Sequence, residues 1–226
     1  MKKYFSIQQL NQTADIYIFG EIVPWEIFPG EVSANGIVNR IKDLNVDEIC
    51  VHIDSYGGSV SEGWAIYNAL RQHPARVTTY GDGFVASAAL YPFLAGDERI
   101  ASNLSAYYFH QVSVSAYGYA DELRKAADEA DQMTEIGISA FVERTGMEEN
   151  AVRELMEAET WVTPSQALEY GIATSMIKDD SLSVAQDAKK SIMQRVLSQK
   201  TGEKPPEIDP PPSEKQTLKE KIKNMI

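Results

Sequence analysis

Three histidines occur in this 226-residue sequence, and their settings differ. His52 lies inside an apolar run typical of a strand, and His73 precedes a proline at the end of a helical pattern. Only His110 follows directly on a short strand pattern, at the point where the strand ends. A histidine in such a position is more often structural than catalytic, so its sequence position alone does not define a site.

Ser87 is a candidate partner for His110, because it lies among small residues (VASAA) after a Gly-Asp-Gly segment. Small neighbours leave its hydroxyl accessible to a base and a substrate together. Nucleophilic catalysis also needs free backbone N–H groups for a developing oxyanion, and helix starts and glycine turns such as Gly57-Gly58 supply them. Each feature also has a common structural explanation, as a simple turn or as helix packing. The residues by themselves are therefore compatible with a serine hydrolase but do not establish one.

The elements expected to position these residues alternate between strand and helix patterns. A mostly parallel sheet with right-handed crossovers follows from such alternation, so the predicted fold class is α/β. The third strand is expected to stop at its glycines, at residues 81–83. The predicted strand and helix pairs are 14–19 with 30–43, 48–53 with a helix beginning at 59, and 77–80 with a helix beginning near 86.

A long amphipathic helix is predicted over residues 119–144, after two short strands at 98–101 and 106–109. Its small and apolar residues form one stripe. Such a helix usually packs on its own molecule, but it can also project and bury its stripe against a neighbouring subunit. Self-association is therefore an expectation from the sequence.

Composition excludes several classes of function. The formal charge of −12 repels phosphate backbones and anionic lipids, so neither nucleic acid nor membrane is an expected partner. Cys50 is the single cysteine, which excludes an internal disulfide and a cysteine-rich metal site. No signal-peptide pattern and no apolar run of about 18 residues is present, so a cytoplasmic location is expected.

The composition changes near Asp179. Residues 1–178 are predicted to form one domain, and residues 179–226 a charged, proline-rich tail ending in a short helix. Two interpretations of the tail stay open, namely a solubilising segment and a docking peptide for a partner.

Four blocks in order along the chain resemble the signature segments of the ClpP family of serine peptidases. The resemblance implies the ClpP/crotonase-like fold, built from repeated β-β-α and βαβ units with a protruding "handle" helix. The four blocks are residues 54–60 (DSYGGSV), 83–89 (GFVASAA), 109–111 (FHQ) and 159–171 (ETWVTPSQALEYG).

Carried over position by position, the resemblance implies a catalytic site without metal or cofactor. Ser87 would be the nucleophile, His110 the general base and then acid, and Glu159 the carboxylate that orients the imidazole. The N–H groups of Gly58 and Ala88 would form the oxyanion hole.

The sequence departs from the family pattern at several positions. Glu159 stands where the family typically has aspartate, and the extra methylene moves the carboxylate by more than about 1 Å, enough to weaken a positioned hydrogen bond. Tyr56 replaces a usual proline, Ala88 a usual methionine, and Val112 the proline that normally follows His-Gln. None of these departures removes a catalytic atom, but loss of the proline is expected to loosen the glycine loop. The alternating segment from Val112 to Ser115 is expected to pair with an extended peptide by strand addition.

The family resemblance further implies a homo-oligomer of stacked rings that encloses the active sites. Any ATP use must come from a separate Clp-type ATPase, because the sequence has no phosphate-binding loop of its own. The divergent blocks and the tail favour a phage head-maturation protease acting on capsid or scaffold proteins inside a procapsid. The alternatives are a housekeeping subunit working with an unfoldase, a catalytically silent ring scaffold, and, least favoured, a relative acting on acyl-CoA thioesters.

Overall fold

The computed structural model describes residues 5–10, 12–25 and 31–177, so the predicted tail and its terminal helix lie outside the described residues. The strands are β1 (Phe5–Leu10), β2 (Thr13–Phe19), β3 (Glu21–Val23), β4 (Glu31–Ser33), β5 (Glu48–Ser55), β6 (Arg76–Ala86), β7 (Glu98–Ala101), β8 (Ala106–Tyr108), β9 (Trp161–Val162) and β10 (Ser175–Met176). The helices are α1 (Ala34–Lys42), α2 (Val60–Gln72), α3 (Leu90–Leu94), α4 (Ala120–Thr145), α5 (Glu149–Glu157) and α6 (Pro164–Glu169), with a 3-10 turn at Ser87–Ala89.

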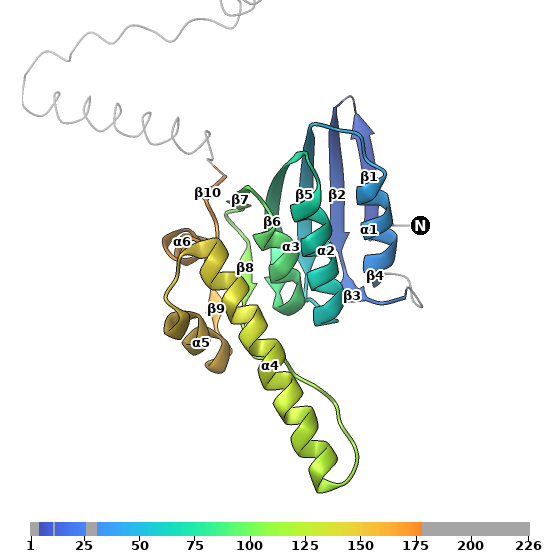
Figure 1. Cartoon of the computed structure of the whole chain (residues 1–226). Helices are drawn as coiled ribbons and strands as arrows, with labels where there is room; N and C mark the ends of the chain where they lie inside the picture. Colours follow the sequence, from blue (N-terminus) through green and yellow to red (C-terminus); the bar gives the residue numbers. More distant parts are fainter. Residues whose placement is uncertain (1–4, 11, 26–30, 178–226) are drawn as a thin grey trace, which may run out of the picture. The chain divides into compact units, whose positions relative to one another are not determined.

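The main sheet runs in the order β1-β2-β5-β6-β7-β10, and β8 and β9 extend it beside the far end of β6. The strands from β2 to β10 in that order pair in parallel, which confirms the predicted α/β class. The crossover helices α1, α2 and α3 lie together over one face of the sheet (Figure 1). Alternate residues of β2 and β5 are therefore fully buried against them, as the period of two in a half-covered strand requires.

Strand β6 corrects one prediction, because it continues through the glycines that were expected to stop it. Its pairing with β5 shifts register between Ile53 and Ser55, and the extra residues are accommodated there. The carboxylate of Asp54 accepts a hydrogen bond from the N–H of Phe84 at 3.0 Å, and a side chain at Gly83 would collide with that carboxylate. Because β6 is long, its first half pairs with β7 and its second half with β8. This split brings the ends of β6 and β8 side by side.

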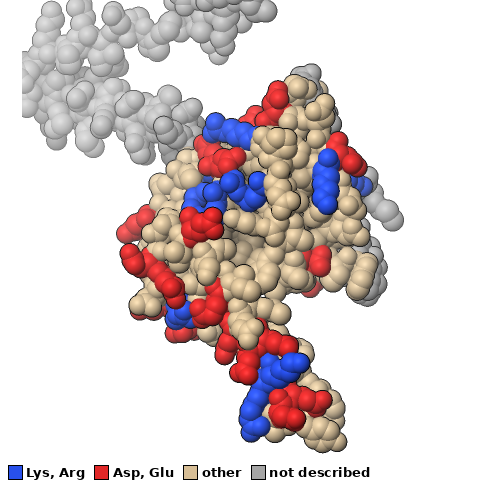
Figure 2. Space-filling view, in the orientation of Figure 1, with Lys and Arg blue, Asp and Glu red and all other residues tan. Residues whose placement is uncertain are grey.

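Helix α4 matches the predicted long helix to within one residue at each end. Its C-terminal half is buried through Thr134, Ile138 and Phe141, whereas its N-terminal half projects away from the sheet (Figure 1). Acidic and basic side chains gather on the projecting part (Figure 2). The side chain of Arg144 fixes the buried end by donating to the carbonyl oxygens of Leu94 and Gly96, at 3.0 and 2.6 Å. No helix among the described residues combines the length and apolar character needed to cross a membrane.

Candidate active site

Ser87 begins the 3-10 turn at the end of β6 and has a left-handed backbone, with φ of +54°. A non-glycine residue in that region is strained by about 1–3 kcal/mol and persists only where the surroundings enforce it. The next residue, Ala88, is buried, while Ser87 itself stays partly exposed. The sharp turn therefore presents the hydroxyl at the C-terminal end of β6.

Two glycines allow other elements to enclose this turn. A Cβ atom at Gly57 would lie 2.6 Å from the carbonyl oxygen of Ala86 and 2.8 Å from the nitrogen of Ala88. A Cβ atom at Gly63, inside α2, would lie 2.6 Å from the carbonyl oxygen of Ala88. Glycine is needed at both positions because the backbones approach too closely for a side chain.

The Gly57-Gly58 loop is held in turn by Ser55 and β3. The buried Ser55 hydroxyl donates to the carbonyl oxygen of Gly20 and accepts from the N–H of Gly57 at 3.0 Å. Ile22 bonds on both sides of Gly58, with its N–H to the carbonyl of Gly57 (2.7 Å) and its carbonyl to the N–H of Ser59 (2.8 Å). The expected loosening at Tyr56 is thus opposed by these bonds.

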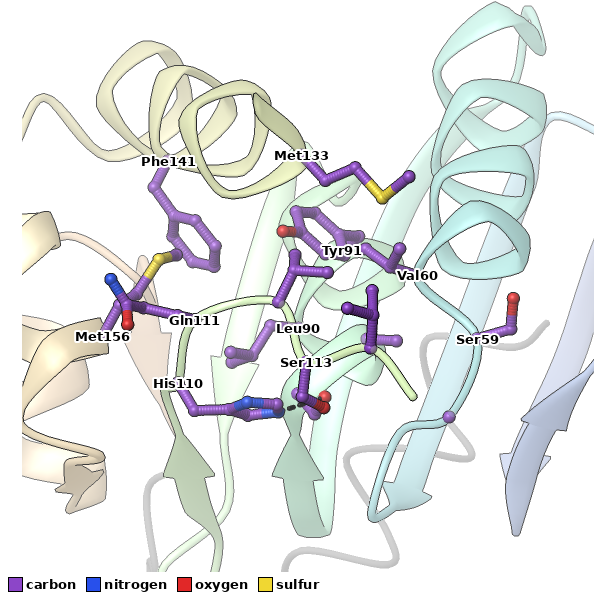
Figure 3. A pocket seen from close by; sticks show the side chains of 15 residues that line it. Ser59, Val60, Leu90, Tyr91, His110, Gln111, Ser113, Met133, Phe141 and Met156 are labelled. Atoms are coloured by element: carbon purple, nitrogen blue, oxygen red, sulfur yellow. Dashed lines mark hydrogen bonds between the residues drawn. The ribbon is translucent and has the colours of Figure 1, made fainter. Parts of the chain in front are cut away.

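His110 follows β8, whose pairing with β6 places Tyr108 opposite Ala86. Its Nε2 lies 2.6 Å from the Oγ of Ser87, although the residues are 23 positions apart (Figure 3). For Nε2 to accept the serine proton, the proton of the neutral ring must reside on Nδ1. The ring of Tyr108 stacks on the imidazole, with centroids 5.6 Å apart and planes 28° apart.

The predicted oxyanion donors lie beside this pair. Since Ile22 bonds to the residues on either side of Gly58, the N–H of Gly58 points away from β3, and no partner for it occurs within the described part of the chain. Ala88 is second in the 3-10 turn, where an N–H group has no acceptor within the turn. Gly58, Ser87, Ala88 and His110 line the same pocket.

The structure does not join Glu159 to this group. The N–H of Phe109 donates to the carbonyl of Thr160 at 3.0 Å, so the turn containing Glu159 runs next to His110. However, the Glu159 side chain is exposed, and the bond to Ser87 is the only one that the His110 ring makes to any described residue. Glu159 also has a left-handed backbone, with φ of +50°.

A pocket of about 270 Å³ opens beside the Ser87 hydroxyl, and its lining includes no Asp, Glu, Lys or Arg. Helices α4 and α5 contribute its deeper walls, as Figure 3 shows for Met133, Phe141 and Met156. Burial raises the pKa of the Tyr91 hydroxyl in the same wall above its usual value, so this group stays neutral. The pocket therefore suits an uncharged, apolar side chain.

Several positioning residues were not predicted from the sequence. Ser55 precedes a glycine pair in the manner of a serine turn, which is a usable signal. Gly63 interrupts a helical pattern, which signals close backbone approach. Nothing in the sequence indicated that Tyr108 stacks on His110, or that Thr134 bonds to Val112 in the segment after His110. No group of three or more metal-ligating side chains occurs in the described ranges.

A serine in hydrogen-bond contact with a histidine, beside free backbone N–H groups, is the arrangement of a serine hydrolase. The family model described as Clp protease matches residues 3–180. ATP-dependent Clp protease proteolytic subunit 2 of Treponema pallidum is 32% identical over 177 residues, covering 76% of this chain and 85% of the relative. The subunit of the same name from Corynebacterium diphtheriae is 30% identical over 151 residues, covering 64% and 76%.

Among solved structures, a ClpP1 mutant from Listeria monocytogenes superposes with a TM-score of 0.61 over 74% of this chain and 92% of its own. Its sequence identity is 24%, so this likeness supports the fold alone. The chain belongs to the Clp protease family, and it is accordingly a serine peptidase of the ClpP type.

Proposed function

We propose that this chain is the proteolytic subunit of a chambered peptidase, in which Ser87 and His110 cleave peptide bonds of chains delivered by a separate ATP-dependent unfoldase. The contact of 2.6 Å between His110 Nε2 and Ser87 Oγ carries the proposal, because it places a base within proton-transfer reach of an accessible hydroxyl. The hydroxyl is held there by a strained, tightly packed turn.

The proposed reaction proceeds through an acyl-enzyme. Ser87 Oγ attacks the peptide carbonyl carbon while His110 Nε2 takes the hydroxyl proton, and the N–H groups of Gly58 and Ala88 bind the oxyanion. The C–N bond then breaks and His110 passes the proton to the leaving amine. Water, deprotonated by His110, hydrolyses the ester and restores the serine. Glu159, on the neighbouring turn, is proposed to contribute only weakly to orienting the imidazole, because no hydrogen bond joins its exposed side chain to His110.

Substrate binding is proposed to use the segment that follows His110. Gln111, Val112, Ser113 and Val114 line the pocket, and they form no regular strand pairing in the described chain. Apart from the Val112 N–H, which donates to Thr134 Oγ1, their backbone groups have no hydrogen-bond partner among the described residues and suit the addition of an extended peptide, which depends little on sequence. The apolar pocket would then receive one side chain of that peptide next to the scissile bond.

The assembly proposed is a homo-oligomer of stacked rings in the cytoplasm. The projecting part of α4 supports it, because Leu123 in the predicted stripe is 44% exposed among the described residues. The two relatives named above are called proteolytic subunits of ATP-dependent proteases, which supports a separate ATPase partner. Electron microscopy of the purified protein would test the rings, and a monomer at every concentration would contradict them.

A phage head-maturation role was expected from the divergent blocks and the tail. The comparisons offer no support for it, since the matched relatives are named as subunits of ATP-dependent Clp proteases. We therefore favour the unfoldase-dependent function. The phage role is retained as an outcome of the experiment below.

Labelling with a fluorophosphonate probe tests the nucleophile. We expect wild type to be labelled, Ser87→Ala not to be labelled, and His110→Ala to be labelled at least about a hundredfold more slowly, because general-base catalysis supplies 10²–10⁴ in rate. Ser59→Ala is the matched control, since Ser59 lines the same pocket but lies away from His110. Absence of labelling in every assembled state would instead support a silent ring scaffold.

Substrate size tests the partner. A short fluorogenic peptide should be cleaved without ATP, whereas a folded protein should be degraded only with a Clp-type ATPase and ATP. Ser87-dependent cleavage of capsid or scaffold protein without any ATPase, detected by mass spectrometry, would favour the phage role over the proposal.

A further inference from the structure

The segment from Gln111 to Gly118, which joins His110 to α4, is held by one hydrogen bond. The N–H of Val112 donates to the Oγ1 of Thr134 at 3.0 Å, and none of the other residues of this segment bonds to a described residue. Val112 is also the only residue of the segment that is not exposed. Among the described residues, the segment therefore has one hydrogen bond to the rest of the protein, made at Val112.

Thr134 is built to serve as that point. It lies in the buried half of α4 with 4% exposure, and its hydroxyl donates to the carbonyl of Ala130 at 3.0 Å. That bond uses the hydroxyl proton and fixes the side-chain rotamer, which leaves a lone pair directed at Val112. Because the hydroxyl is buried, its loss would leave the Val112 N–H without a protein acceptor.

The contact uses a backbone N–H and therefore needs a residue other than proline at position 112, where the family pattern has proline. Proline has no N–H to donate, and its ring fixes φ instead. The departure noted in the sequence is therefore matched by a partner on α4. Here the hydrogen bond to Thr134 restrains the backbone at position 112, which the proline ring would otherwise restrain by fixing φ.

We infer that Thr134 is a positioning residue for peptide hydrolysis. Its hydroxyl holds Val112, two residues after His110, and thereby sets the position of Ser113 and Val114 along the pocket. The inference rests on the proposed function, since it concerns peptide binding at that site. It assigns to α4 a role inside the active site of its own subunit, in addition to any contact with other subunits.

The test compares Thr134→Val, which removes the hydroxyl at nearly constant volume, with Thr134→Ser, which keeps it. For a fluorogenic peptide, we expect Thr134→Val to lower kcat/KM about tenfold, mainly through KM, which is the loss of one hydrogen bond's contribution. Thr134→Ser should stay within about twofold of wild type. Fluorophosphonate labelling of Ser87 should change less than about twofold in either variant, because the probe has no peptide backbone to align.

A double-mutant cycle with Val112→Pro isolates the pair. Adding Thr134→Val to Val112→Pro should cause no further loss, because the bond is already absent. Equal kcat/KM of Thr134→Val and wild type, or equal impairment of Thr134→Ser and Thr134→Val, would overturn the inference. So would a parallel fall in peptide cleavage and probe labelling, which indicates general damage to α4.

Amide hydrogen exchange separates this inference from the proposed function. The Val112 amide should be protected in the wild-type protein and should exchange at least about tenfold faster in Thr134→Val, whether or not the protein cleaves peptides. If wild type neither labels nor cleaves but Val112 is protected through Thr134, the proposed function fails while the anchor stands. An unprotected Val112 amide in wild type refutes the anchor itself.

Discussion

Ser87 and Glu159 are the two non-glycine residues in the described ranges with left-handed backbones, at φ of +54° and +50°, yet their surroundings differ. The Ser87 turn is enclosed by the Gly57 loop and by α2, at distances that exclude any added side chain. The Glu159 turn is exposed and is held by backbone bonds, such as the 3.3 Å bond from its N–H to the carbonyl of Met156.

The difference concerns how each half of the candidate site is kept in place. The proposed nucleophile and the proposed oxyanion donors are fixed by packing, which deforms only at high cost. The carboxylate depends on a surface turn and on a flexible side chain, so its position responds readily to its surroundings. Substitutions around Ser87 should therefore have larger effects than substitutions at Glu159.

Gly57→Ala should have the largest effect. The new Cβ would press on Ala86 and Ala88 at 2.6 and 2.8 Å, in a backbone with φ of +94° that side chains disfavour. Because the displaced nitrogen of Ala88 is a proposed oxyanion donor, we expect kcat/KM for a peptide to fall by at least about a hundredfold, as when one such donor is lost.

Gly146→Ala is the matched control for this prediction. It carries a similar backbone penalty at φ of +75°, about 1–2 kcal/mol, but nothing lies within 4 Å of the added atom. Its free energy of unfolding should fall while its kcat/KM stays near wild type. If both variants lose activity equally, backbone strain and not packing against Ser87 explains the result.

The contrast also explains what the sequence could and could not predict. Strands β2, β5, β7 and β8 and helices α1, α2 and α4 followed from sequence pattern, and the ends of α4 were predicted to within one residue. Strands β1 and β3 and helix α5 were not predicted, and residues 31–33, expected to begin the first helix, form strand β4. The extent of β6 was missed because its glycines resemble a turn, whereas Asp54 bonds to Phe84 and keeps the strand continuous. Local pattern does not contain such a long-range partner.

The sequence allowed the candidate site residues to be named, but it did not allow their arrangement in space to be predicted. Ser87 and His110 were found from their blocks, but their contact depends on β8 pairing with the second half of β6, which no local signal encodes. The left-handed φ of Ser87 occurs in a turn that Gly57 and Gly63 approach closely, and no local pattern indicates it. Glu159 was reached through resemblance alone, and its actual reach toward His110 depends on a side-chain conformation that spacing cannot give.

Ser55→Ala should have an intermediate effect, since it loosens the loop that encloses Ser87. Removing the buried hydroxyl leaves the Gly57 N–H and the Gly20 carbonyl without this partner, which costs about 1–3 kcal/mol. Urea unfolding should show that loss, with a smaller fall in kcat/KM than Gly57→Ala causes. Ser59→Ala is again the control, because among the described residues its hydroxyl bonds only to that of the exposed Ser61, at 3.0 Å. An unchanged unfolding midpoint for Ser55→Ala would show that the loop is held without it.

Glu159→Gln should have the smallest effect on peptide cleavage. In a triad with a tight carboxylate–imidazole bond, the corresponding amide substitution lowers kcat about 10⁴-fold. His110 makes no such bond to Glu159 here, so we expect kcat/KM to fall less than about tenfold, with Glu157→Gln, exposed at the end of α5, as the control. Glu159→Asp should fold at least as well as wild type, because aspartate tolerates a left-handed backbone better than glutamate. A loss near 10⁴ for Glu159→Gln alone would mean that assembly draws the carboxylate onto His110, so that both halves of the site are tightly held in the working particle.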